Sequence, residues 1–114
     1  MSAKKITTGK AHVIESTAQF EEYKSGCGNM LLVVDFHAPW CGPCRSIGPA
    51  FEKIATETLD ACFIKVDVDE LEDVAALCEV SCMPTFHFYK NGSRLKVFSG
   101  ANETTLKELV AEFK

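Results

Sequence analysis

The chain has no long hydrophobic run and no excess of positive charge. Its longest apolar stretch is far shorter than the roughly 20 residues that a membrane-spanning helix needs. Residues 1–10 do not form a charged and apolar leader. The formal net charge is -4, and no basic stripe stands out along the sequence. We therefore expect a soluble intracellular protein that binds neither membranes nor nucleic acids.

Cysteine, in contrast, is abundant, with six in 114 residues. A chain of this length buries about 65% of its unfolded surface when it folds, so its core is stable without covalent links. In a reducing compartment, cysteines are more often catalytic, metal-binding or free than joined in permanent disulfides. The cysteines are therefore the first candidates for chemistry.

Apolar periodicity predicts one α/β domain over residues 11–114, preceded by a loose arm over residues 1–10. The expected strands cover 11–14, 31–37, 61–68, 85–90 and 94–99. The expected helices cover 17–24, a stretch from near residue 45, a short one with residues 74, 77 and 78 facing inward, and a last one capped by Asn102. The order βαβαβαββα, with a hairpin at Asn91-Gly92, implies a central mixed β-sheet flanked by helices on both faces.

Two cysteines lie three residues apart in Trp40-Cys41-Gly42-Pro43-Cys44, where a buried strand passes into a helix. The N-terminus of a helix carries about half a positive charge and several unpaired N–H groups, which stabilise a thiolate placed there. Pro43 fits the first turn because it has no N–H to donate and its φ angle suits a helix. Gly42 allows the backbone of another chain to approach closely. The motif therefore predicts a reactive dithiol.

An acidic residue, Asp35, interrupts the otherwise apolar strand shortly before Cys41. Burial of a carboxylate is unfavourable and raises its pKa, which makes the group a proton donor or acceptor near neutral pH. Lys65 on the neighbouring strand is the favoured charged partner, although a Lys65 that is simply exposed is about equally expected, and local N–H groups also satisfy such an acid. Because Asp35 lies near the end of its strand, we expect it beneath the start of the helix that carries Cys44.

The cysteine spacing also fits a metal site, because Cys41, Cys44, Cys78 and Cys82 together supply the four thiolates of a zinc centre. The long α/β segment between the two pairs argues against this alternative, since the ligand pairs of a zinc ribbon usually lie close in sequence. Cys27 is expected to be an exposed thiol in a turn, with no partner.

Several motifs together resemble the thioredoxin family in order and spacing. They are Val33-Val34-Asp35-Phe36, Trp40-Cys41-Gly42-Pro43-Cys44, Val66-Asp67-Val68-Asp69, Met83-Pro84-Thr85, Asn91-Gly92 and Phe98-Ser99-Gly100-Ala101-Asn102. The resemblance extends from about residue 11 to residue 113, and residues 78–86 are similar to the cytosolic animal type. It implies a thioredoxin fold, a cis peptide bond before Pro84 and a protein disulfide reductase that maintains the cellular thiol redox state.

The resemblance also implies a role for individual residues. Cys41 is then the exposed nucleophile, Cys44 the resolving thiol and Asp35 the buried acid that takes the proton from Cys44. The residues expected to line a shallow substrate groove are Trp40, Gly42, Pro43, Met83, Pro84, Gly100 and Ala101. Cys82 matches a cysteine that forms an intersubunit disulfide in animal thioredoxins, so we expect a Cys82-linked homodimer on oxidation.

For cofactors and partners, the family implies no bound cofactor and no metal ion. Reducing equivalents are expected from NADPH through a thioredoxin reductase, and the substrates are proteins that contain disulfides. The expected location is the cytoplasm, and the nucleus as well. An alternative function is a redox-sensitive binding subunit that holds a partner through the same groove. A third alternative, an oxidising or isomerising catalyst, is disfavoured because such domains usually carry His where this chain has Pro43.

Overall fold

Strands and helices alternate along the chain until a final hairpin and helix. The computed structural model describes residues 6–114. In chain order the elements are β1 (Ala11–Val13), α1 (Thr17–Gly26), β2 (Leu31–His37), α2 (Gly42–Glu57), β3 (Ala61–Asp67), α3 (Glu72–Leu77), β4 (Thr85–Lys90), β5 (Ser93–Ser99) and α4 (Glu103–Phe113). The predicted βαβαβαββα order is confirmed. Among residues 6–114, no helix combines the length and the apolar character needed to cross a membrane.

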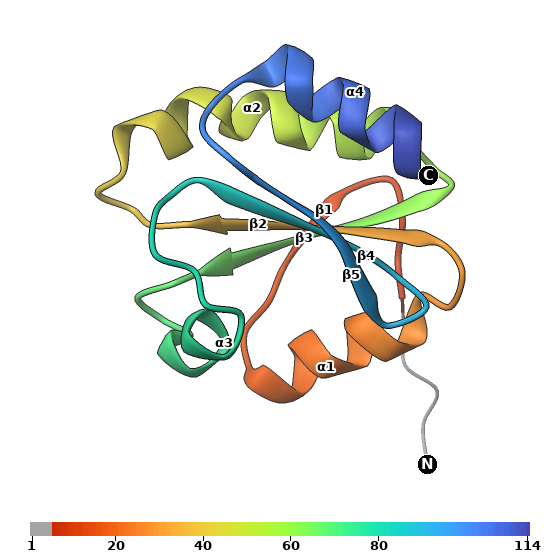
Figure 1. Cartoon of the computed structure of the whole chain (residues 1–114), viewed down its shortest axis with the longest axis horizontal. Helices are drawn as coiled ribbons and strands as arrows, with labels where there is room; N and C mark the ends of the chain where they lie inside the picture. The colour runs from red at the N-terminus through yellow and green to blue at the C-terminus, as the bar shows by residue number, and fades with distance from the viewer. Residues whose placement is uncertain (1–5) are drawn as a thin grey trace.

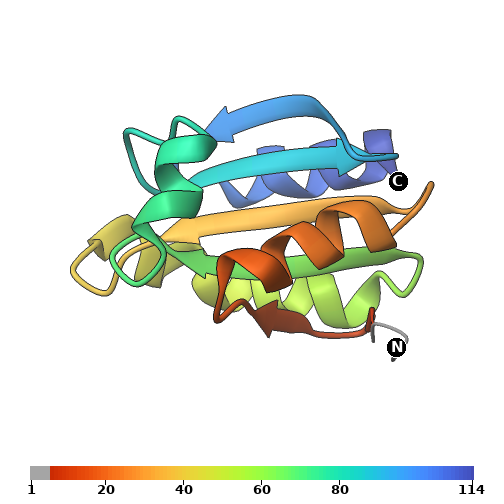
Figure 2. The ribbon, with the colours of Figure 1, turned by 90° about the horizontal axis from the view of Figure 1, so that it is seen from below.

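The five strands of the described region form one mixed sheet in the order β1-β3-β2-β4-β5. β3 pairs in parallel with β1 and β2, whereas β4 pairs antiparallel with β2 and β5. Figure 1 shows α2 and α4 on one face of the sheet and α1 and α3 on the other, and Figure 2 shows the strand order from below. The predicted mixed sheet between two layers of helices is therefore confirmed.

The central strand β2 supplies side chains to two separate cores, because successive side chains of a strand point to opposite faces. Leu31 and Val33 pack in the first core, which includes residues of α2 and α4. Leu32 and Val34 pack in the second core, which includes residues of α1 and α3. Asp35 follows Leu31 and Val33 at alternate positions, so the strand places its carboxyl on the α2 side of the sheet.

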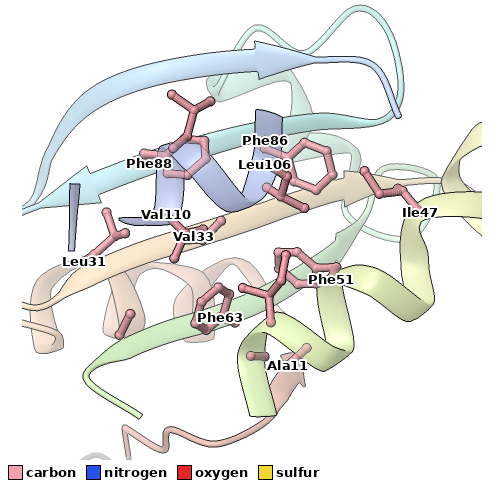
Figure 3. Close-up of a cluster of buried hydrophobic side chains, with 14 residues drawn as sticks. Ala11, Leu31, Val33, Ile47, Phe51, Phe63, Phe86, Phe88, Leu106 and Val110 are labelled. Carbon is pink, nitrogen blue, oxygen red and sulfur yellow. The ribbon is translucent and has the colours of Figure 1, made fainter. Parts of the chain in front are cut away.

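Aromatic rings fill the centre of the first core (Figure 3). Phe51 of α2 is fully buried, and its ring centroid lies 5.6 Å from that of Phe63 and 5.8 Å from that of Phe86. Edge-to-face and tilted contacts at such distances add to the free energy gained from area burial. This packing fixes α2, and with it the cysteine pair, against the sheet.

Helix α2 begins at Gly42, whereas the sequence predicted a start near Arg45. The reason is that Cys41 is itself the N-cap residue, with extended backbone angles, so the following residue is already helical. The helix then continues through Pro49.

Helix α3 shows a second difference. Leu77 was predicted to face inward, but it is 63% exposed, whereas Val74 is buried as expected. The buried positions flanking this short helix are Leu71 and Cys78, so the inward line follows residues 71, 74 and 78. Leu77 lies off that line because one helical residue turns the chain by about 100°.

The predicted arm over residues 1–10 falls partly outside the described residues, which begin at residue 6. Ile6 packs against the second core, and the Thr7 hydroxyl lies 3.3 Å from the hydroxyl of Tyr23. This half of the predicted arm is therefore held against the domain. The division of the chain at residue 11 stays a prediction.

Candidate active site

The two cysteines of the central motif form a disulfide at the start of α2. Cys41 and Cys44 are joined, and their Cα atoms are 5.2 Å apart. The Cys41 sulfur also accepts a hydrogen bond from the backbone N–H of Cys44, at 3.1 Å. One sulfur thus caps the N-terminus of the helix, where unpaired N–H groups stabilise negative charge. The predicted placement of the dithiol at a helix N-terminus is confirmed.

Cys41 was expected to be exposed, but only 4% of the residue is accessible in this disulfide form. It belongs to a small apolar cluster with Ala38 and Cys44, against which Met83 and Val68 pack. These neighbours come from the loop after β2, from the region after β3 and from the loop before β4. They cover the disulfide from several sides, which explains its burial.

Trp40 stands at the exposed edge of this cluster. It is 65% exposed, and its indole N–H donates a hydrogen bond of 2.9 Å to the Asp69 carboxylate. The loop that carries Asp69 is itself fixed, because the Asp67 carboxylate accepts hydrogen bonds from the backbone N–H groups of Asp69 and Glu70. Asp69 was not predicted to have a role, since only the fold brings the loop after β3 next to the motif.

The loop before β4 contains the predicted cis peptide bond, between Met83 and Pro84. The backbone N–H of Gly100 donates a hydrogen bond of 3.0 Å to the carbonyl of Pro84. Gly100 has a φ angle of 110°, which a residue with a side chain rarely adopts. Met83, Pro84 and Gly100 thus lie together beside the cysteine cluster, with Ala101 directly after Gly100 and exposed.

Gly42 and Pro43 occupy the first turn of α2, and both are exposed. Of the residues predicted to form the groove, the structure brings Met83 into contact with the cysteine cluster. It joins Pro84 to Gly100 by a hydrogen bond and leaves Trp40 open to solvent. The arrangement presents an exposed rim around a buried disulfide.

Asp35 is buried beneath α2, as predicted. Only 2% of the residue is accessible, and it lines a cleft of about 540 Å³ together with Cys44, Gly48 and other residues. Burial raises the pKa of the Asp35 carboxyl from 3.8 to about 7, against the opposing influence of Lys65. Within residues 6–114, its Oδ1 atom has no hydrogen-bond partner. A carboxyl with such a pKa can take up or release a proton near neutral pH.

Lys65, the predicted charged partner of Asp35, acts on Asp35 by its charge but forms its ion pair with another residue. Asp35 and Lys65 are register partners on β2 and β3, but the Lys65 ammonium donates its hydrogen bond to Glu52, at 3.0 Å. Glu52 belongs to α2 and lines the same cleft. Glu52 was not among the predicted site residues, although residues 44, 48 and 52 follow the spacing of one helix face.

His37 also lines the cleft, at the end of β2. Burial and the nearby Lys65 ammonium lower its pKa, while Asp67 has the opposite influence. The imidazole is therefore largely neutral at pH 7 and adds little charge to the site.

The four remaining cysteines are free. Cys27 was expected to be an exposed thiol without a partner, but it is buried in the second core, which also contains Cys62. The turn after α1 folds back onto β3, which explains the difference. Cys78 lies in the same core, away from the Cys41–Cys44 cluster. No group of three or more His, Cys, Asp or Glu side chains with the arrangement of a metal site occurs in residues 6–114.

Cys82 is exposed, in the loop before the cis bond. Its sulfur lies 3.6 Å from the Ser99 hydroxyl and 3.7 Å from the Thr85 hydroxyl. These hydrogen bonds, with that of Ser99 the stronger influence, lower the pKa of the Cys82 thiol. A thiol with these properties is a site for oxidation.

Comparisons with known proteins agree on one family. The family model for thioredoxin matches residues 11–112. Thioredoxin from Ictalurus punctatus is 48% identical over 103 residues, which cover 89% of this chain and 96% of that protein. Thioredoxin from Rattus norvegicus is 48% identical over 101 residues, again covering 89% and 96%. The X-ray structure of Fasciola hepatica thioredoxin has a TM-score of 0.88 and 46% identity, and the match covers 90% of this chain and 99% of that one.

Proposed function

The chain belongs to the thioredoxin family and is a protein disulfide reductase, and we propose that Cys41 and Cys44 act in it as attacking and resolving thiols. The supporting observation is the position of Cys41 as N-cap of α2, where its sulfur accepts the N–H of Cys44. The same helix start stabilises Cys41 as a thiolate in the reduced protein. The intact cysteine pair favours this activity over the alternative of a binding subunit.

In the first step, the Cys41 thiolate forms a bond to one sulfur of a substrate disulfide. The substrate S–S bond breaks, and the departing sulfur takes up a proton and leaves as a thiol. In the second step, the Cys44 thiolate attacks the Cys41 sulfur, and the other substrate sulfur leaves as a second thiol. The protein ends with the Cys41–Cys44 disulfide, so two thiols of the protein are oxidised and one substrate disulfide is reduced.

We assign to Asp35 the uptake of the proton from Cys44 before the second step. Both residues line one cleft beneath α2, and the carboxyl has a pKa of about 7. A base whose pKa lies near the working pH combines availability with driving force for proton transfer. Water in the cleft connects the two groups in this proposal.

The groove residues contact the substrate in this account. An extended substrate segment lies beside Met83 and Pro84, and Trp40 and Ala101 border it. Gly42 and Pro43 leave the first turn of α2 open to the approach of its backbone.

Turnover of insulin tests the function. Reduced protein, NADPH and an added thioredoxin reductase are mixed with insulin, and NADPH consumption is recorded for the native chain and for Cys41→Ser. We expect steady consumption by the native chain and none above background for the variant, with circular dichroism to verify that the variant is folded. Turnover that persists in Cys41→Ser would contradict the role of Cys41. A native chain without turnover would contradict the reductase activity.

We further propose that NADPH supplies the electrons through a thioredoxin reductase, and that the chain holds no cofactor of its own. Members of the family act on disulfides without a bound cofactor, and the cysteine pair carries the two electrons. Omitting either NADPH or the reductase should abolish insulin reduction, followed here as precipitation of the reduced insulin chains, and added dithiothreitol should restore it. Insulin reduction in the absence of NADPH, the reductase and dithiothreitol would contradict this electron source.

Oxidation is proposed to link two chains through Cys82. Two Cys82 thiols and one molecule of hydrogen peroxide give one intersubunit disulfide and two molecules of water. The exposed thiol with a lowered pKa supports this reaction. Non-reducing electrophoresis after peroxide treatment should show a dimer that is absent in Cys82→Ser, and a dimer that persists in this variant would contradict the assignment.

The proposed location is the cytoplasm, and the nucleus as well. The similarity of residues 78–86 to cytosolic animal thioredoxins supports it, as do the four free cysteines, which suit a reducing compartment. Fractionation of cells with an antibody against the protein tests this proposal, and recovery in a secretory or mitochondrial fraction would contradict it.

A further inference from the structure

One face of α2 lies over the cleft that contains Asp35. Cys44, Gly48 and Glu52 follow one another at intervals of four residues, so their side chains are on the same side of the helix. All three line the cleft, together with Asp35 and Lys65 from the sheet below. The absence of a side chain at Gly48 leaves space between the two polar ends, Cys44 and Glu52.

The charges in this cleft are paired in an unexpected way. Register on the sheet places Lys65 opposite Asp35, but the Lys65 ammonium is hydrogen-bonded to the Glu52 carboxylate at 3.0 Å. The Lys65 side chain is 22% exposed and that of Glu52 is 47% exposed, whereas Asp35 is almost completely buried. The ion pair therefore lies toward solvent, and the Oδ1 atom of Asp35 has no hydrogen-bond partner in residues 6–114.

We propose that Glu52 is a positioning residue for the reductase reaction: its ion pair with Lys65 holds the ammonium away from Asp35, which thereby remains able to accept the Cys44 proton. This inference rests on the role proposed for Asp35. A free Lys65 ammonium would form its ion pair with Asp35 and stabilise the carboxylate, which would make it a weaker base at neutral pH.

The other charged or titratable groups around Asp35 do not hold the Lys65 ammonium away from its carboxyl. His37 is largely neutral at pH 7 because burial and Lys65 lower its pKa. The Arg45 guanidinium donates to the Pro39 carbonyl at 2.7 Å and is thereby held at the outer edge of the cleft. Lys65 and Glu52 are the charged groups that influence the pKa of Asp35 after burial, Lys65 lowering it and Glu52 raising it.

The variant Glu52→Gln tests the proposal. It removes the charge and keeps the size of the side chain, so the Lys65 ammonium is released. The titration midpoint of Asp35 is measured directly by ¹³C NMR of its carboxyl carbon, in parallel with the pH profile of insulin reduction. We expect the midpoint to fall by roughly 0.5–1 pH unit, because an opposite charge nearby stabilises the carboxylate. The pH profile should move in the same direction.

Glu57→Gln is the matched control. Glu57 lies on the same helix and carries the same charge, but it lines a different part of the surface, beside α4. This variant should leave the midpoint of Asp35 and the pH profile unchanged. An equal shift in both variants would mean that only the net charge of the protein matters, and would overturn the proposal.

The variant Lys65→Met separates action through Lys65 from direct repulsion between Glu52 and Asp35. In the Lys65→Met background, Glu52→Gln should shift the Asp35 midpoint by less than half of its effect in the native chain. An undiminished shift would mean that Glu52 acts directly on Asp35, and would contradict the positioning role. If the midpoint moves while the pH profile stays fixed, and Asp35→Asn also leaves the profile unchanged, Asp35 does not take the Cys44 proton. The positioning role of Glu52 in the reaction would then be refuted as well, although Glu52 would still influence the titration of Asp35.

Discussion

Replacement of Asp35 by Asn should make the protein more stable at neutral and alkaline pH. The carboxyl is buried, and its pKa rises from 3.8 to about 7 on folding because burial disfavours the charged form. The folded protein therefore binds a proton that the unfolded chain releases between these two pH values. Stability falls as the pH rises from about 4 to about 7, since the folded state then contains a buried charge.

The size of the effect follows from the same values. At about 1.4 kcal/mol for each pKa unit, the rise corresponds to about 4 kcal/mol once both states are ionised. Asn has nearly the same shape and no charge, so the variant should lack this loss. Below pH 4 the native carboxyl is neutral too, and the advantage of the variant should disappear.

Urea unfolding of the oxidised forms of both proteins measures this difference. Midpoints and slopes recorded at about pH 4 and about pH 8.5 give the free energy of unfolding at each pH, and other titrating groups cancel between the two proteins. We expect the stability difference to change by several kcal/mol in favour of the Asp35→Asn variant at the higher pH. Parallel pH dependence in the two proteins would show that Asp35 titrates like an exposed carboxyl, and would refute the burial argument.

Two further predictions concern buried side chains. Phe51→Ala should lower the free energy of unfolding, measured by urea denaturation, by about 3–5 kcal/mol, because it leaves a cavity against Phe63 and Phe86. As a control, Leu77→Ala replaces an exposed side chain and should change the free energy of unfolding by less than about 0.5 kcal/mol. Equal effects of the two substitutions would contradict the packing of α2. His87 is buried, and burial followed by the charge of Arg94 lowers its pKa from 6.5 to about 4. The free energy of unfolding should therefore decrease as the pH falls from about 6.5 toward 4, because in this range the imidazole binds a proton in the unfolded chain but not in the folded protein. Urea unfolding across that range should show a weaker decrease for His87→Gln. The same decrease in both proteins would mean that His87 is charged in the folded protein.

Local signals in the sequence were enough to predict most of the elements. Asn102 accepts a hydrogen bond from the Thr105 N–H at the start of α4, as its position before apolar periodicity predicts. Asn91 and Gly92 both have positive φ angles in the predicted hairpin. Each of these features depends on neighbouring residues, which the sequence displays directly.

Features that depend on contacts between elements were harder to predict. Leu77 ends a helix too short to show a clear apolar face, so its exposure was missed. Cys27 is buried because the turn after α1 packs on β3, and no local pattern indicates this contact. The chemistry of Asp35 was visible as an acid in an apolar strand. The pairing of Lys65 with Glu52 depends on how α2 crosses the sheet, and so became apparent only in the fold.

In the reaction that we propose, Cys41 attacks the substrate and Cys44 resolves the mixed disulfide. The most direct measurement uses reduced Cys44→Ser and Cys41→Ser, each mixed with a peptide that contains a single disulfide, and mass spectrometry to locate covalent adducts. We expect a stable adduct on Cys41 in Cys44→Ser, because no resolving thiol releases it, and little adduct on Cys44 in Cys41→Ser. Accumulation on Cys44 in Cys41→Ser, with no adduct on Cys41 in Cys44→Ser, would mean that the two roles are reversed.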